Sequence, residues 1–357
     1  MACINGSICY KNHSDNLQFF LVGDTGGLPV YPYITYTQNL VAKRMAKIGD
    51  KGNIHIQFIV SVGDNIYFTG VKNEFDKRFQ DTFEDIYKGE ALGKPWYLIA
   101  GNHDHFGNIS GQIAYTNRSK RWTYPSSYYK VSYVFGRNTK KLVEFLMIDT
   151  ISLCGNTRDI TEAGFFDMVF ATADKNPNRP KNPAAAKAQL DWIEQQLNSS
   201  NRADYLFVLG HYPIYSVSTH GPTNCLIEKL KPLLEKYHAT AYIAGHDHSL
   251  QHIITEYTSS SDTTKKIPLH YIVSGAASRT DRSLKHMDTI PKGSLRFNYP
   301  SKGFNPFSQL GLSTGGFIYV DMENDKATFI FYNGKGNKKY TCKLSPRENF
   351  TMNKAKK

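Results

Sequence analysis

Five short polar motifs in this sequence begin with glycine, and each follows an apolar run typical of a β-strand. They are Gly23-Asp24-Thr25-Gly26, Gly63-Asp64-Asn65-Ile66-Tyr67, Gly101-Asn102-His103-Asp104, Gly210-His211-Tyr212-Pro213 and Gly245-His246-Asp247-His248. In α/β proteins ligands bind at the carboxyl ends of strands, and a glycine there lets the backbone bend sharply and approach a ligand closely. We therefore expect the five motifs to form one site.

The donor atoms in these motifs are typical of a metal centre. Carboxylate, phenol, amide and imidazole groups suit iron, zinc or manganese, and the absence of cysteine argues against iron–sulfur chemistry. Each motif alone is more often a turn or a polar loop, but five in succession are not explained that way. Seven donors exceed the needs of one ion, and two ions about 3.5–4 Å apart can clamp both oxygens of a phosphoryl displacement. The candidate ligands are Asp24, Asp64, Tyr67, Asn102, His211, His246 and His248.

Composition excludes several other classes of protein. The chain has 357 residues, of which 40% are hydrophobic and 21% charged, as in soluble globular proteins. No apolar run approaches the roughly 18 residues that a membrane-spanning helix needs. The net charge is +12, but the Lys and Arg residues are scattered, whereas proteins that bind nucleic acid gather them on one face. We expect no nucleic-acid partner, and we interpret the charge as steering the protein towards anionic substrates or surfaces.

Apolar runs alternate with amphipathic stretches, which predicts an α/β protein with two sheets back to back and helices outside. The expected strands are Leu17–Val22, Gln57–Val62, Trp96–Ala100, Val143–Ile148, Tyr205–Leu209, Ala241–Ala244, His270–Val273, Phe317–Val320 and Ala327–Tyr332. The last three runs are joined by turns, which favours antiparallel pairing. The expected helices are Thr37–Ile48, Phe75–Ile86 and Ala184–Leu197.

We expect one catalytic domain over residues 16–346, with an N-terminal tail at 1–15 and a basic C-terminal tail at 347–357. The stretch Gly155–Pro183 is rich in Pro and Asn at its centre and predicts a long surface loop.

The motif series resembles that of the calcineurin-like metallophosphoesterases, and Tyr67 narrows the resemblance to the purple acid phosphatases. Similarity spreads beyond the motifs, roughly from Leu17 to Leu344, and is greatest to small type 5 tartrate-resistant enzymes of the uteroferrin kind. The fold implied is a metallophosphoesterase β-sandwich of two mixed sheets flanked by helices.

The resemblance implies a role for each candidate ligand. Asp24, Tyr67 and His248 would hold a ferric ion, and Asp64 would bridge it to a second ion. Asn102, His211 and His246 would complete the second site, which takes iron(II), zinc or manganese.

Other positions also match the family. His103 and His220 match histidines that contact the substrate phosphate and protonate the leaving group, and Cys154 and Cys225 match a disulfide pair. The loop Gly155–Pro183 matches a segment whose cleavage raises activity. One departure is Thr25, where the family carries Trp.

The implied activity is hydrolysis of phosphate monoesters by a metal-bound hydroxide at an Fe(III)–M(II) centre, with phosphorylated small molecules or phosphoproteins as substrates and a monomeric enzyme. Two alternatives stay open at this point. The same centre could hydrolyse phosphodiesters or pyrophosphate-type bonds, or the chain could keep the fold as a scaffold with weak catalysis. Retention of all seven ligand positions disfavours the scaffold.

The compartment is expected to be secretory or lysosomal, from the family and from six Asn-x-Ser/Thr triplets. The glycosylation candidates are Asn108, Asn117 and Asn198. Against this, the first fifteen residues lack the apolar stretch of a signal peptide, so either the true start is missing or the protein stays inside.

Overall fold

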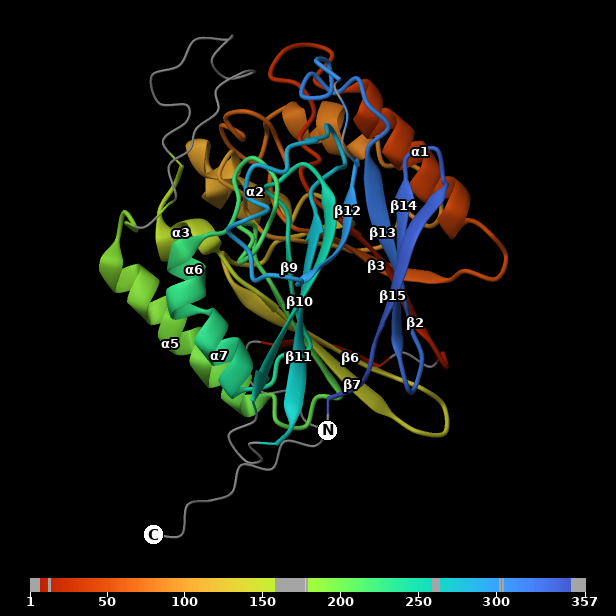
Figure 1. Cartoon of the computed structure of the whole chain (residues 1–357). Helices are drawn as coiled ribbons and strands as arrows, with labels where there is room; N and C mark the ends of the chain where they lie inside the picture. Colours follow the sequence, from red (N-terminus) through yellow and green to blue (C-terminus); the bar gives the residue numbers. More distant parts are fainter. Residues whose placement is uncertain are drawn as a thin grey trace.

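The computed structural model describes residues 7–11, 14–157, 177, 179–258, 264–301, 303 and 305–347. Two mixed β-sheets lie face to face, and helices cover their outer sides (Figure 1). This arrangement confirms the predicted fold class.

The seven-stranded sheet carries the first three motifs. Its strands β2, β3, β4 and β5 are parallel neighbours, and β13, β14 and β15 continue the sheet in antiparallel pairing. In sheet order the strands are β15 (Lys338–Leu344), β14 (Ala327–Asn333), β13 (Gly316–Met322), β2 (Leu17–Val22), β3 (Ile56–Ser61), β4 (Trp96–Leu98) and β5 (Trp122–Thr123).

The eight-stranded sheet carries the two histidine motifs. Strands β7, β8, β9 and β11 are parallel neighbours, whereas β10 pairs antiparallel with both β11 and β12. In sheet order the strands are β1 (Ser7–Lys11), β6 (Tyr129–Phe135), β7 (Lys141–Met147), β8 (Tyr205–Leu209), β9 (Ala241–Ala244), β11 (Lys266–Ser274), β10 (Leu250–Thr258) and β12 (Leu295–Tyr299).

The helices lie on the outer sides of the sandwich. Figure 1 shows α3, α5, α6 and α7 together on one side and α1 on the other. Thr35 starts α1 with a capping box, because its hydroxyl accepts from the Gln38 amide nitrogen while the Gln38 side chain reaches back. The helices are α1 (Tyr36–Gly49), α2 (Ile109–Tyr115), α3 (Thr150–Cys154), α5 (Pro183–Ser199), α6 (Asn224–Lys229) and α7 (Lys231–Lys236).

Aromatic side chains join the two sheets. Phe19 of β2 and Phe58 of β3 stack with their ring centroids 4.7 Å apart. Both meet Phe145 of β7 edge to face, at 5.5 and 5.6 Å. All three side chains are fully buried, and such ring pairs add to the free energy gained from burial alone. The sheets are therefore held in one relative position, which also places the ends of their strands.

Two local predictions need correction. The helix expected over Phe75–Ile86 is wrong: only Phe79–Glu84 is helical, as a π-helical turn. The Asp76 carboxylate accepts from the Lys72 and Arg78 amide nitrogens, which satisfies these groups without a helix. Among the late runs, β13 and β14 pair antiparallel as predicted. β11 pairs antiparallel with β10 but parallel with β9, so its prediction holds for one of its two neighbours.

The segments expected as tails and loop are only partly described. Residues 7–11, expected in the N-terminal tail, form β1 and pair in parallel with β6. Residues 158–176 and 178 of the expected surface loop, and residues 348–357 of the C-terminal tail, lie outside the described residues.

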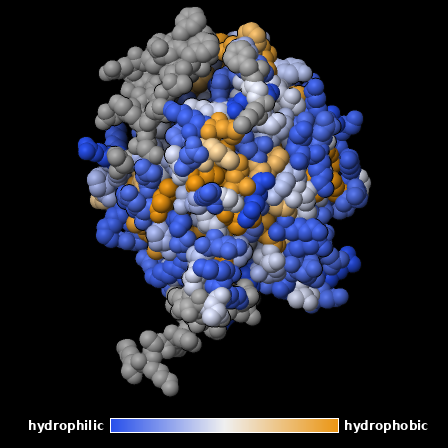
Figure 2. Space-filling view, in the orientation of Figure 1, coloured by the Kyte–Doolittle hydropathy of each residue, from blue (hydrophilic) through white to orange (hydrophobic). Residues whose placement is uncertain are grey.

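The face in Figure 2 is mostly hydrophilic, with hydrophobic residues near its middle and at its upper edge. Within the described part of the chain, no helix is both long and apolar enough to span a bilayer.

The predicted disulfide is confirmed. Cys154, at the end of α3, is bonded to Cys225 in α6, with the Cα atoms 5.8 Å apart. The two cysteines are 71 residues apart in the chain. Cys342 is a buried free thiol.

We predict that replacing Cys154 and Cys225 together by Ser lowers the free energy of unfolding by about 2–4 kcal/mol, the usual contribution of a disulfide that closes a long loop. Denaturant unfolding of the oxidised protein measures this loss. Cys342→Ala is the control, and it should leave the disulfide peptide intact in non-reducing peptide mapping. An unchanged unfolding midpoint in the double variant would contradict the prediction.

Candidate metal centre

The two sheets bring their strand ends to one place. Asp24, Asp64 and Asn102 follow the parallel neighbours β2, β3 and β4, whereas His211 and His246 follow β8 and β9. Hydrogen bonds cross between the two sets. The His246 amide nitrogen donates to Asp24 Oδ2 at 2.9 Å, and His211 Nδ1 lies 2.9 Å from the Val62 carbonyl oxygen.

The backbone is strained at this junction. Asp24, Asp64 and His246 have positive φ angles of 58°, 53° and 69°. They are three of the five non-glycine residues with positive φ in the described ranges. Such conformations cost about 1–3 kcal/mol each and persist where the surroundings hold them, most often at functional sites.

Two of the motif glycines allow the donor side chains to approach one another closely. Gly63 has a φ of +93°, and a Cβ there would lie 2.6 Å from His211 Nδ1. A Cβ on Gly101 would collide with the Asp64 carboxylate. Side chains at either position would push the donors apart, so the site requires glycine.

One group of donors surrounds the Tyr67 hydroxyl. Tyr67 Oη donates to Asp24 Oδ1 at 3.0 Å and lies 2.9 Å from His248 Nε2. His248 Nδ1 is 2.9 Å from Gln309 Oε1. Because an amide oxygen only accepts, the imidazole proton is assigned to Nδ1, which leaves the Nε2 lone pair facing Tyr67.

A second group of donors surrounds His211. Its Nε2 lies 3.0 Å from Asn102 Oδ1 and 3.4 Å from Asp64 Oδ1. One donor atom from each of Asp64, His211 and His246 falls within 4.8 Å of the others, and all three side chains are buried. The structure thus brings together all seven residues singled out from the motifs, in two adjoining groups.

Burial and neighbouring charges shift the pKa values of the two carboxylates in this cluster in opposite directions. Desolvation and the nearby Asp64 charge raise the pKa of Asp24 well above its ordinary value, although His211 opposes them. Burial also acts to raise the pKa of Asp64, but His211 and His103 outweigh it and the pKa is lowered.

The tyrosine and histidines of the cluster are shifted as well. Burial and the two carboxylates raise the pKa of Tyr67, and burial with neighbouring histidines or Arg279 lowers the pKa values of His246 and His248. A multivalent cation would supply the positive charge that these anionic and neutral donors lack. The donor set therefore fits metal ions.

His103 and His220 lie at the partly exposed rim of the cluster. His103 Nδ1 is 2.9 Å from the Phe68 carbonyl oxygen, and its Nε2 is 3.9 Å from Asp64 Oδ2. Burial lowers the pKa of His103 to about 4. The His220 ring lies 4.1 Å from the His246 ring, and the His220 amide nitrogen donates to Asp247 Oδ1.

Three supporting residues were not identified from the sequence. Asp104 accepts from the amide nitrogens of Gly101 and Asn65, at 2.8 and 3.0 Å, and so ties the loops of the second and third motifs together. Asp104 is the last residue of the third motif, so its position in the motif could have identified it. Gln309 and Arg279 lie far along the chain from the residues they contact, and no local pattern pointed to them.

The remaining sequence candidates are dispersed. Asn108, Asn117 and Asn198 are all exposed, but Asn108 also caps α2 and its Nδ2 donates to the Lys72 carbonyl oxygen. Thr25 is buried beside Asp24.

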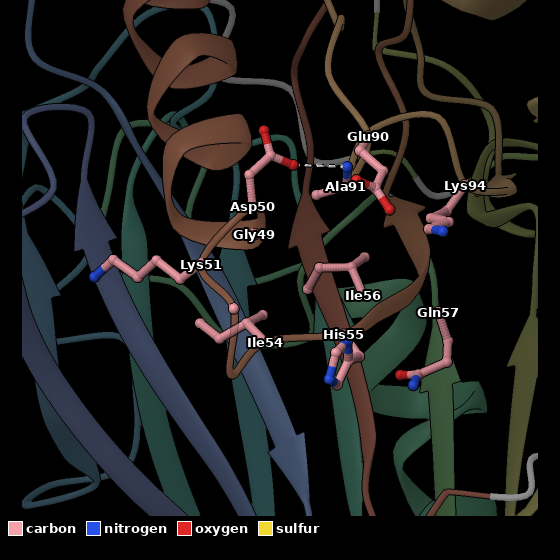
Figure 3. A pocket seen from close by; sticks show the side chains of 11 residues that line it. Gly49, Asp50, Lys51, Ile54, His55, Ile56, Gln57, Glu90, Ala91 and Lys94 are labelled. Carbon is pink, nitrogen blue, oxygen red and sulfur yellow. Dashed lines mark hydrogen bonds between the residues drawn. The ribbon is translucent and has the colours of Figure 1, made fainter.

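A cavity of about 460 Å³ lies elsewhere, near the amino ends of β3 and β4. Figure 3 shows the Asp50 carboxylate turned toward the backbone of Ala91, whose nitrogen donates to it at 2.9 Å. The metal-type donors lie at the opposite, carboxyl ends of the same strands. The cavity is therefore separate from the cluster.

Known proteins share this sequence and this fold. The calcineurin-like phosphoesterase family matches residues 17–250. The tartrate-resistant acid phosphatase type 5 of Mus musculus is 40% identical over 332 residues, which cover 93% of this chain and 91% of the mouse protein.

Two solved structures share the fold at lower identity. A purple acid phosphatase from yellow lupin seeds has a TM-score of 0.59 and 16% identity, covering 94% of this chain and 55% of the lupin chain. GAP50, the anchor in the inner membrane complex of Plasmodium, has a TM-score of 0.70 and 22% identity, covering 94% and 90% of the two chains.

The chain thus belongs to the calcineurin-like phosphoesterase family and, within it, to the purple acid phosphatases of the type 5 tartrate-resistant group.

Proposed function

We propose that this chain is an acid phosphatase that hydrolyses phosphate monoesters at a dinuclear metal centre. The observation that carries the proposal is the buried cluster of seven donors, in which Asp64 lies beside both groups. Two groups with one carboxylate between them match the needs of two neighbouring ions. Experiments on the donors, below, test the proposal.

The type of donor atom would decide which of the two ions each residue binds. Asp24, Tyr67 and His248 would hold a ferric ion, because a phenolate and carboxylates stabilise the higher charge. Asn102, His211 and His246 are neutral donors and favour a divalent ion, which is iron(II), zinc or manganese. Asp64 would be shared. When bound, the ions supply Lewis acidity toward the phosphoryl oxygens and a water nucleophile at acidic pH.

The chain's own groups would bind and orient the substrate at the rim. His103 directs Nδ1 to the Phe68 carbonyl, so this histidine is held in one orientation. With its pKa lowered to about 4, it is mostly neutral at mildly acidic pH and acts as a hydrogen-bonding group toward the phosphate. It is therefore a poor source of protons in that range.

His220 is the better candidate for proton donor to the leaving group. Its amide nitrogen donates to Asp247 Oδ1 at 3.0 Å, which holds the backbone of this loop in place. Its ring lies 4.1 Å from the His246 ring, tilted by 31°, so it faces the second group of donors. From the sequence this role is open between His103 and His220. The lowered pKa of His103 and the position of the His220 ring beside His246 favour His220.

The substrates would be phosphorylated small molecules or phosphoproteins, and the compartment would be oxidising. The Cys154–Cys225 disulfide supports secretion or delivery to lysosomes, since such bonds persist outside the cytosol. Exposed Asn117 and Asn198 are compatible with glycosylation on that route.

Tyr67 tests the ferric site. A phenolate bound to ferric iron gives a visible charge-transfer band, so the oxidised protein should be pink to purple. Tyr67→Phe should abolish the band while the protein stays folded, because only one hydroxyl group is lost. Visible absorption is measured together with iron content and circular dichroism. A colourless wild-type protein that contains two irons would refute the assignment.

Asp64 tests the bridge between the two ions. Asp64→Ala removes the carboxylate that both groups share, so metal content should fall from about two ions per chain to below one, with loss of activity. Asp24→Ala should release mainly the ferric ion. Metal analysis of the purified variants measures both effects. An Asp64→Ala protein with two metals and normal turnover would show that the bridge is misassigned.

The two rim histidines should differ in their response to the leaving group. A general acid matters most for poor leaving groups, so His220→Ala should lower kcat by roughly 10²-fold or more with alkyl phosphates and much less with p-nitrophenyl phosphate. His103→Ala should slow both substrates to a similar extent, and both variants should keep their metal. Equal losses on both substrates in His220→Ala would contradict its assignment as the acid.

A further inference from the structure

Arg279 is a buried cation that lies against the proposed tyrosine ligand. Its guanidinium carbon is 4.1 Å from the centroid of the Tyr67 ring and 4.8 Å from that of Phe68. The residue is only 4% exposed. Its Nη2 donates to the Gly27 carbonyl oxygen at 2.6 Å, in the loop that carries Asp24.

This cation has no direct ionic partner among the described residues. No carboxylate there lies within 4.0 Å of it, and its Nε is buried without a hydrogen-bond partner. Burying an unpaired charge costs free energy. The attraction that offsets this cost comes from the face of the Tyr67 ring and, at longer range, from Asp24 and Asp64.

Two simpler roles do not account for the charge. The Arg279 guanidinium faces the Tyr67 and Phe68 rings and the Gly27 carbonyl, so its known contacts are with the protein and do not point to substrate. Its hydrogen bond to Gly27 anchors a loop, but any neutral donor can make that bond. Because a guanidinium stays protonated throughout the range in which proteins fold, its positive charge is a permanent feature of the tyrosine's surroundings.

We propose that Arg279 tunes how strongly Tyr67 donates electrons to the metal ion that it binds. A positive charge over the ring face lowers the energy of the filled ring orbitals, because it attracts the electrons in them. The phenolate is then a weaker donor, and a ferric ion bound to it is more easily reduced. Arg279 thus acts indirectly: it places a positive charge beside Tyr67, and Tyr67 passes the effect on to the ion. This inference rests on the proposed function, in which Tyr67 binds ferric iron.

The charge-transfer band measures the effect directly. The ring is in contact with Arg279, whereas the ion would lie beyond the phenol oxygen, so the charge lowers the donor orbital more than the acceptor orbital. Removing the charge should therefore decrease the transition energy and move the band to longer wavelength. The same change should shift the reduction of the chromophoric iron to lower potential.

The experiment compares Arg279→Gln and Arg279→Met, which remove the charge, with Arg279→Lys, which keeps it. Gln additionally retains a side-chain donor for the Gly27 carbonyl. Visible spectra and a mediated redox titration are recorded on holoenzyme with quantified iron. Both neutral variants should show the shift to longer wavelength and lower potential, and Arg279→Lys should restore most of the wild-type position.

Arg78 offers a matched control. Its guanidinium stacks at 4.6 Å on Tyr33, which is not a candidate ligand, and it donates to the Gly26 carbonyl, next to Gly27. Arg78→Gln loses the same charge and the same kind of contact from the neighbouring loop position. Its band should stay at the wild-type wavelength.

The outcomes separate this inference from the proposed function. A wild-type protein with ferric iron but no band refutes Tyr67 as a ligand and with it the function as proposed. A wild-type band that is unmoved in iron-loaded Arg279→Gln and Arg279→Met overturns the tuning role alone. An Arg279→Lys band shifted as far as the neutral variants, or neutral variants that cannot bind iron, assigns Arg279 to packing or assembly and also overturns it.

Discussion

The rest of the site depends on the burial of two carboxylates close to each other at the ends of neighbouring strands. Asp24 and Asp64 are almost fully inaccessible to water, and the charge of one opposes the ionisation of the other. Two negative charges in a low-dielectric interior are stable only near positive charge. Three features of the site follow from this requirement. The imidazoles around the carboxylates and the more distant Arg279 guanidinium supply positive charge, and the strained backbone holds the two carboxylates in place until cations neutralise them.

Much of this arrangement was predictable because it is local in the sequence. A glycine after an apolar run marks the end of a strand, and the next residue then points to the edge of the sheet where parallel neighbours also end. That logic predicted the convergence of all five motifs, and the alternation of apolar and amphipathic stretches predicted the two-sheet fold. The prediction of a helix over Phe75–Ile86 was wrong because it considered only the spacing of apolar residues. The Asp76 carboxylate accepts hydrogen bonds from nearby backbone amides, and this competes with helix formation.

What could not be predicted is non-local. Gln309 orients His248 across 61 residues, and Arg279 stacks on Tyr67 from a loop more than two hundred residues away. Neither residue has a spacing or neighbour that distinguishes it from a surface residue. β1 was missed for a related reason, because its five residues gain their partners only when β6 has formed. These contacts form only when the two sheets are packed together. Sequence patterns that repeat every few residues cannot predict them.

The division of the donors between the sheets has a consequence for stability. Asp24, Asp64, Tyr67 and Asn102 belong to loops of the seven-stranded sheet. The three histidines proposed as ligands belong to loops of the eight-stranded one. A complete site therefore exists only when the sheets are packed as the Phe19–Phe145 contact holds them. Ions that bind the packed state and not the unfolded chain stabilise it by mass action. Binding free energy would then offset the strain at Asp24, Asp64 and His246, and the proposed metal centre would also cross-link the two halves of the fold.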